Sequence, residues 1–242
     1  MGTDVRAHRV RVASLREGRV WLYGGEAHHL ARVLRSRPGD AVRAFDGDGL
    51  EAEGRVAAVA GDRVELCLGA PAEAEREAPL SLTLVVGLLK GDKLTQVVRQ
   101  STELGVDAVV PVVSRRADVP RLSPGKAERL ARVAEQAAKQ SGRARVPRIG
   151  PPRPLDEVVW EGPAWVADPH GGTPIRERGR QLAEAGAAHL TVFTGPEGGF
   201  TPEEVEGLRG RGATPVALGP RVLRAETAPV AVAAAVLTWL AP

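Results

Sequence analysis

Two glycine-rich turns carry the residue types best suited to binding a ligand. The first, FTGPEGGFTPEE at 193–204, joins a strand-like run to a helix-like run and holds three glycines. Glycines let backbone N–H and C=O groups face a ligand without obstruction by side chains. Thr201 and Glu204 form a T-x-x-E capping box with Pro202 between them. A tight strand-to-helix turn is the alternative, but three glycines exceed what it needs, so a bound ligand is favoured.

The second turn, LGPRVLRAETAPVA at 218–231, adds charged groups to an apolar stretch. A strand-like run ends at Gly219, and an apolar helix is expected to begin near Thr227. Arg221, Arg224 and Glu226 stand between them, and charged groups in such surroundings normally need a partner. A ligand could supply that partner. Alternatively, Arg224 and Glu226 pair with neighbours or cap the helix.

The sequence lacks the motifs that several other kinds of binding and catalytic site require. GLLKGDK at 87–93 has the wrong spacing for a phosphate loop, and neither G-x-G-x-x-G after a strand nor G-x-S-x-G occurs. The five histidines show no metal-binding spacing. The single cysteine, Cys67, excludes disulfides and a two-thiol mechanism, and it is expected to be a small core residue.

The elements that must position these turns alternate between strands and helices from residue 80 onward. This alternation predicts an α/β domain around a mainly parallel sheet, whose ligand should lie beyond the carboxyl ends of the strands. The last helix is apolar almost all round, so it should lie in a core or a subunit interface. The strand-like runs are 80–89, 108–114, 164–168, 190–195 and 214–219, and the helix-like runs are 92–105, 124–142, 173–186, 201–212 and 225–240.

The first 70 residues differ, because they predict short strands with one helix, at 26–35. A hairpin over 51–68 turns at Gly61-Asp62, and the unit is expected to be a compact β-barrel. The charged, proline-bounded run 71–79 is typical of a linker. The predicted division is therefore a domain at 1–70, a linker at 71–79 and a domain at 80–242.

The formal net charge of +3 over 242 residues hides an uneven distribution. Residues 115–148 carry ten basic side chains against three acidic ones, which could bind phosphates, although a charge run is more often a solvated helix face. The 29 arginines against four lysines fit heat adaptation, a GC-rich genome or RNA binding. One cysteine, no apolar run of about 18 residues and no signal peptide predict a cytoplasmic setting.

The two turns also carry a family resemblance. GPEGGF followed by LGPRVLRAETA resembles the C-terminal signature of the SPOUT methyltransferases. In detail the chain resembles the ribosomal small subunit methyltransferase E family, which methylates N3 of a uridine in 16S rRNA. Residues 28–49 are similar to its N-terminal PUA-like domain, and 90–106 and 135–147 to its central motifs, including Gln136, Gln140, Ser141 and Arg143.

The resemblance implies a fold and a cofactor. The fold is a SPOUT-type α/β domain with a deep trefoil knot, preceded by a small PUA-like β-barrel. The cofactor is S-adenosylmethionine, held against the two glycine-rich turns, with a third wall near Ala167 and Asp168. The implied cofactor residues are Ala167, Thr194, Gly195, Pro196, Glu197, Gly198, Gly199, Leu218, Gly219, Arg221, Val222, Leu223, Arg224, Thr227 and Ala228.

The resemblance also implies partners. SPOUT enzymes are usually homodimers with the active site at the interface, so the expected partners are a second copy and the 16S rRNA of the small ribosomal subunit, with neither a membrane nor a metal. The expected RNA contacts are Arg9, Arg11, Arg32, Arg35, Arg115, Arg116 and Arg143.

Methylation of uridine N3 requires loss of the proton on that nitrogen. A cation near uracil O2 or O4 would stabilise the anionic base, and Arg224 or Arg9 could supply it. Glu226 or Glu197 could accept the proton, although a structural role for Glu226 is an equal alternative.

Two rival classes stay open. A non-catalytic RNA-binding protein would bind RNA without S-adenosylmethionine, and a Rossmann-like dehydrogenase is disfavoured by the missing glycine fingerprint. Within the methyltransferase class, another nucleotide or a ribose 2′-hydroxyl is the alternative target.

Overall fold

The computed structural model describes residues 7–239, whose contacts divide the chain into two units. The first unit ends at Glu77 and also contains Ala138–Val146, a segment distant in sequence. The second comprises Ala78–Ala137 and the chain from Pro147 onward. The assignment of residues 138–146 to the first unit was not predicted by composition or periodicity.

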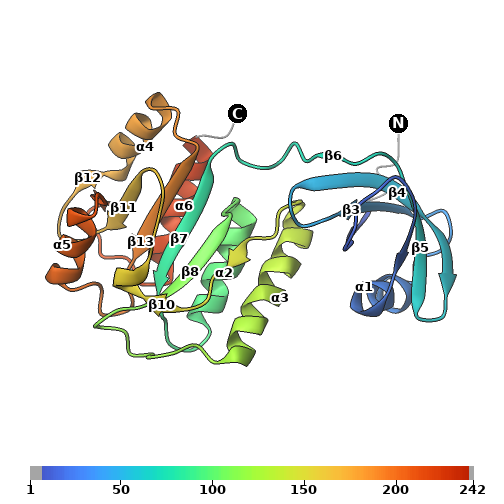
Figure 1. Ribbon diagram of the computed structural model, residues 1–242, viewed down its shortest axis with the longest axis horizontal. Coiled ribbons are helices and arrows are strands. Elements are labelled where there is room, and N and C mark those ends of the chain that lie inside the picture. The colour runs from blue at the N-terminus through green and yellow to red at the C-terminus, as the bar shows by residue number, and fades with distance from the viewer. Residues whose placement is uncertain (1–6, 240–242) are drawn as a thin grey trace. The chain divides into compact units, whose positions relative to one another are not determined.

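The first unit is built on a six-stranded sheet, shown on the blue side of the colour range in Figure 1. Its order is β1-β3-β4-β5-β2, with β6 paired to β4, and only β1 and β3 pair in parallel. Among the described residues no ladder joins β1 to β2, so the predicted barrel is an open sheet in its hydrogen bonding. The strands are β1 (His8–Arg11), β2 (Gly18–Leu22), β3 (Ala41–Phe45), β4 (Leu50–Ala60), β5 (Arg63–Leu68) and β6 (Ala72–Glu73).

Alternation along the strands builds the core of this unit, because every second side chain faces the same way. Val20 and Leu22 of β2 point into the core with residues of β5. The predicted hairpin turn at Gly61-Asp62 is confirmed by the pairing of Ala60 with Arg63. The helix expected at 26–35 is instead α1 (Gly24–His28), continued by a π-helical turn (His29–Val33).

The second unit contains an eight-stranded sheet in which every pair is parallel, which confirms the α/β prediction. Its order is β10-β8-β7-β13-β11-β14-β12, with β9 on β8. The trefoil knot stays a prediction. The strands are β7 (Ser81–Gly87), β8 (Ala108–Val113), β9 (Arg148–Ile149), β10 (Arg153–Pro154), β11 (Ala164–Ala167), β12 (Thr173–Pro174), β13 (His189–Thr194) and β14 (Thr214–Ala217).

Helices cover this sheet (Figure 1). They are α2 (Lys93–Leu104), α3 (Pro124–Ser141), α4 (Ile175–Glu184), α5 (Pro202–Gly210) and α6 (Thr227–Trp239), with a 3-10 turn at Leu155–Glu157. Helix α6 packs on α2, α4 and strands β7 and β13, and its Val232 and Val236 are buried. Of the two roles predicted for this helix, the structure confirms that of a core element. None of the helices described is both long and apolar enough to cross a membrane.

Candidate functional site

A cavity of about 820 Å³ lies beyond the carboxyl ends of β11, β13 and β14. This is where a parallel sheet places its ligands, and the volume suits a small-molecule ligand. Its walls come from the segments that follow the three strands, 167–170, 194–200 and most of 218–228. The two glycine-rich turns therefore meet at one site.

The predicted cofactor residues gather here, with one exception. Thr227 does not line the cavity, although its neighbours Glu226 and Ala228 do. Asp168, expected in a third wall, is also present. The cavity-lining members of the prediction are Ala167, Thr194, Gly195, Pro196, Glu197, Gly198, Gly199, Leu218, Gly219, Arg221, Val222, Leu223, Arg224 and Ala228.

Close packing explains why the first turn needs its glycines. A Cβ on Gly195 would lie 2.8 Å from Phe200 N, and one on Gly198 would lie 3.0 Å from Arg116 Cβ. Gly199 has a φ of +67°, which side chains rarely adopt, and its N–H donates to Pro196 O at 2.8 Å. The packing of the turn itself therefore requires these glycines, and the same turn lines the cavity.

Helix α5 begins with the predicted capping box, which is confirmed. Thr201 Oγ1 accepts from Glu204 N at 3.2 Å, and Glu204 Oε2 accepts from Thr201 N at 2.8 Å. The other oxygen of Glu204 accepts from Arg115 N at 2.7 Å. One carboxylate therefore fixes both the start of α5 and the segment that follows β8.

Lys93, at the start of α2, places a cation between the two turns. Its Nζ lies 2.8 Å from Glu197 Oε1 and 3.7 Å from Glu226 Oε2. The hydrogen bond to Glu197 raises the pKa of Lys93. Partial burial acts to raise the pKa of Glu197, but hydrogen bonds from Lys93 and from backbone N–H groups outweigh it and hold that pKa below its usual value. These contacts therefore favour the ionised form of Glu197 in the first turn.

Two buried oxygens at the cavity have no hydrogen-bond partner among the described residues. They are Thr194 Oγ1, at the end of β13, and Glu226 Oε2, in the second turn. Buried polar atoms are nearly always satisfied, so a ligand with hydroxyl or amino groups fits these positions. Arg224 is exposed at the same cavity and forms no ion pair within the described chain.

Comparison with known proteins agrees with this geometry. A family model described as an RNA methyltransferase domain matches residues 76–237, and one described as an RNA methyltransferase PUA domain matches residues 22–69. Ribosomal RNA small subunit methyltransferase E of Bacillus subtilis is 32% identical over 221 residues, which cover 86% of this chain and 85% of that protein. The chain belongs to the ribosomal RNA small subunit methyltransferase E family.

Two further relatives support this membership. The methyltransferase E of Synechocystis is 33% identical over 237 residues, covering 93% of this chain and 75% of that protein. The crystal structure of the methyltransferase E of Neisseria gonorrhoeae, bound to S-adenosyl methionine, superposes with a TM-score of 0.86 at 30% identity. That match covers 97% of this chain and 98% of that one.

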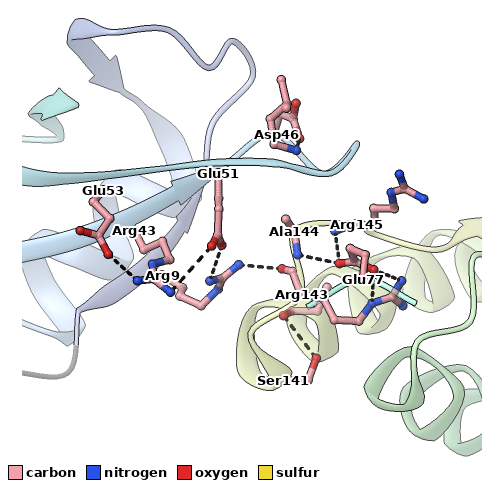
Figure 2. Close-up of polar contacts among 12 residues, drawn as sticks. Arg9, Arg43, Asp46, Glu51, Glu53, Glu77, Ser141, Arg143, Ala144 and Arg145 are labelled. Carbon is pink, nitrogen blue, oxygen red and sulfur yellow. Dashed lines mark hydrogen bonds and ion pairs between the residues drawn. The ribbon is translucent and has the colours of Figure 1, made fainter. Parts of the chain in front are cut away.

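In this member of the methyltransferase E family, Arg9 and Arg143 are placed differently from the prediction (Figure 2). Both lie in the first unit, whereas the cavity belongs to the second. Arg9 Nη1 donates to Glu51 at 3.0 Å and Nη2 to Arg143 O at 2.8 Å, with 14% of the side chain exposed. Its guanidinium is therefore held by contacts inside the first unit, and Arg9 is not among the residues that line the cavity.

Arg143 is the clearer correction. Its side chain is 5% exposed, and its Nε and Nη2 donate to Glu77 at 3.1 and 2.7 Å. The second oxygen of Glu77 accepts from Ala144 N and Arg145 N at 2.9 and 3.0 Å. A buried guanidinium held in this way is not presented to a phosphate, so Arg143 has a structural role in place of the predicted RNA contact.

The remaining predicted RNA contacts are at or near the surface. Arg11 is partly buried and donates to Asp46 O, whereas Arg32, Arg35, Arg115 and Arg116 are exposed. Arg116 also lines the cavity. Part of the basic run 115–148 is neutralised within the chain, because Arg129 pairs with Asp92 and Lys139 with Glu26.

Lys93 is the main residue that the pattern of the sequence did not reveal. Its contacts with Glu197 and Glu226 connect positions more than 100 residues apart. Two signals could have found it. Lys93 is one of only four lysines, against 29 arginines. It also follows strand β7, at the carboxyl edge of the sheet where the two glycine-rich turns lie.

Proposed function

We propose that the chain transfers the methyl group of S-adenosylmethionine to N3 of a uridine in the 16S rRNA of the small ribosomal subunit. The observation that carries this proposal is the cavity itself. Two glycine-rich turns at the carboxyl edge of a parallel sheet enclose it, in a chain of the methyltransferase E family.

The residues at the cavity fit S-adenosylmethionine. The glycines of the first turn, Gly195, Gly198 and Gly199, leave backbone groups accessible at the cavity. Leu218, Val222 and Leu223 of the second turn add apolar side chains, which suit the faces of an adenine ring. Thr194 Oγ1 offers a buried oxygen that no other described residue satisfies. When bound, the cofactor supplies an electrophilic methyl group on a sulfonium.

Glu226 is the better of the two candidate proton acceptors. Glu197 already accepts from Lys93 Nζ and Lys90 N, and its lowered pKa makes it a weak base. Glu226 Oε2 is buried, has no hydrogen-bond partner within residues 7–239 and lies 3.7 Å from Lys93 Nζ. An oxygen in this state can accept the proton of uridine N3, while Lys93 stabilises Glu197 beside it.

Arg224 is the better candidate for stabilising the anionic uracil. It lines the cavity two residues before Glu226, so the cation and the base come from one turn. Arg9, the other candidate, is committed to Glu51 and to a backbone carbonyl. A guanidinium at uracil O2 or O4 would lower the cost of removing the N3 proton.

The chain is further proposed to act in the cytoplasm as a homodimer that binds RNA through basic residues of both units. The exposed Arg32, Arg35, Arg115 and Arg116 are the supporting observation for the RNA contacts. Arg116 lines the cavity and so would sit close to the target nucleotide.

Methyl transfer to small-subunit RNA by purified wild-type, Arg224→Ala and Glu226→Gln protein tests the proposal. Both variants should lose transfer by at least about 100-fold, which should exceed any loss of S-adenosylmethionine affinity in a calorimetric titration. Full activity in either variant would remove that residue from the mechanism. RNA binding without S-adenosylmethionine binding by the wild-type chain would favour a non-catalytic RNA-binding protein.

A further inference from the structure

Two aromatic side chains lie exposed on the sheet of the first unit. Trp21 on β2 and Tyr23 directly after it are 36% and 64% exposed. The chain has only four tryptophans, three phenylalanines and one tyrosine, and that tyrosine is Tyr23. Two neighbouring exposed aromatic residues, in a chain with so few, indicate a binding surface.

The register of the sheet places both rings on one face. Val20 and Leu22 point into the core, so Arg19, Trp21 and Tyr23 point the other way. Alternate side chains of a strand are about 7 Å apart, so the two rings are neighbours on this face. Aromatic residues arranged in this way on an antiparallel sheet stack unpaired RNA bases in known RNA-binding modules.

One cation, Arg63, lies directly beside the rings. The guanidinium carbon of Arg63, on the adjacent strand β5, lies 4.8 Å from the centre of the Trp21 ring. Glu65 is opposite Trp21 in the register, but both of its oxygens accept from Arg19 Nη1, at 3.1 and 3.2 Å, so its charge is neutralised. Glu17 and Asp62 in the flanking turns are acidic, so it is the aromatic rings and Arg63 that favour RNA rather than an excess of positive charge.

We propose that Arg19, Trp21, Tyr23 and Arg63, here called the stacking face, bind unpaired bases of the RNA substrate. The rings of Trp21 and Tyr23 would stack on bases, and Arg63 would contact the phosphate between them. The inference depends on the proposed function in one respect, which is that RNA is the substrate. The two can be tested separately, because the stacking face belongs to the first unit and the cavity to the second.

Fluorescence anisotropy with a single-stranded uridine oligonucleotide and with an RNA duplex of equal length tests this. Trp21→Ala and Tyr23→Ala should each weaken binding of the single strand about 5- to 100-fold, because each removes a stacked base. Binding of the duplex, whose bases are already stacked, should change less than about twofold. Trp21→Phe and Tyr23→Phe should bind almost as the wild type does.

Val59→Ala is the matched control, because Val59 is exposed and apolar on β4 of the same sheet but is not aromatic. It should bind the single strand as the wild type does. Thermal unfolding checks that each variant is folded. Failure of the wild-type chain to bind the single strand, or wild-type affinity in both alanine variants, would overturn the stacking face.

The outcomes also separate this inference from the proposed function. Unchanged RNA affinity in the alanine variants, with methyl transfer intact, overturns the stacking face alone. Weakened RNA affinity in those variants, with no S-adenosylmethionine binding by the wild type, overturns the methyltransferase alone. Loss of self-association in sedimentation, with RNA affinity unchanged, would assign the face to a second copy of the chain.

Discussion

Gly87→Ala tests how strand β7 supports the first glycine-rich turn. Gly87 ends β7 and does not line the cavity, but its missing side chain leaves room for the backbone of the first turn. A Cβ there would lie 2.4 Å from Pro196 N, 2.6 Å from Pro196 Cδ and 2.9 Å from Gly195 C. These neighbours are backbone and ring atoms, so they cannot rotate away.

The size of the effect follows from these distances. Ordinary contact begins near 3.4 Å, so the strand and the turn must separate by about 1 Å. Overpacking of this kind costs about 1–3 kcal/mol of stability. A displacement of about 1 Å at a site that positions reactants can lower the rate about 100-fold. Gly87→Ala should therefore lose both stability and methyl transfer, although Gly87 contacts no substrate.

Urea unfolding, calorimetric titration with S-adenosylmethionine and methyl-transfer rates measure these effects. Gly125→Ala is the control, because no atom lies within 4 Å of its added Cβ and its φ is not positive. It should leave transfer unchanged and raise stability by up to about 1 kcal/mol. Wild-type affinity and rate in Gly87→Ala would refute the claim that the turn is held against β7.

Three further changes probe the supporting contacts. Thr201→Ala should cost about 1 kcal/mol by removing the cap of α5, seen as a fall in the melting temperature of a few degrees. Glu77→Ala should cost about 3–5 kcal/mol in urea unfolding, because the buried Arg143 loses its partner, and Glu77→Gln should cost less. The lowered pKa of Glu197 stabilises the folded form above the usual glutamate range, and this stabilisation is lost as the pH falls through the folded pKa. Lys93→Met should raise that pKa, because it removes a hydrogen bond and a positive charge that lower it, and should move the acid limb of unfolding to higher pH. An unmoved acid limb would contradict the pairing.

Local patterns were enough to predict the elements and the two glycine-rich turns, whereas the individual cofactor residues were predicted from the family resemblance. The alternating runs from residue 80 correspond to β7, α2, β8, α3, β11, α4, β13, α5, β14 and α6, because periodicity and turn residues act locally. The capping box at Thr201 is likewise a property of four consecutive residues. The two glycine-rich turns could be joined in one site because the carboxyl ends of parallel strands share an edge.

Contacts between distant residues could not be predicted in this way. Arg143 is part of a basic run, so it was expected on the surface, but it is buried and paired with Glu77, which lies 66 residues earlier. The position of Lys93 between Glu197 and Glu226 also depends on tertiary packing. The short strands β9, β10 and β12 have two residues each, too few to show a period.

Mass mapping of 16S rRNA tests the proposed reaction most directly. Small-subunit RNA from a strain that lacks the gene would be incubated with the purified protein and S-adenosylmethionine, and the methylated nucleotide located by mass spectrometry. The expected product is one methyl group on N3 of a single uridine. A methyl group on another base atom or on a ribose 2′-hydroxyl, or no transfer at all, would contradict it.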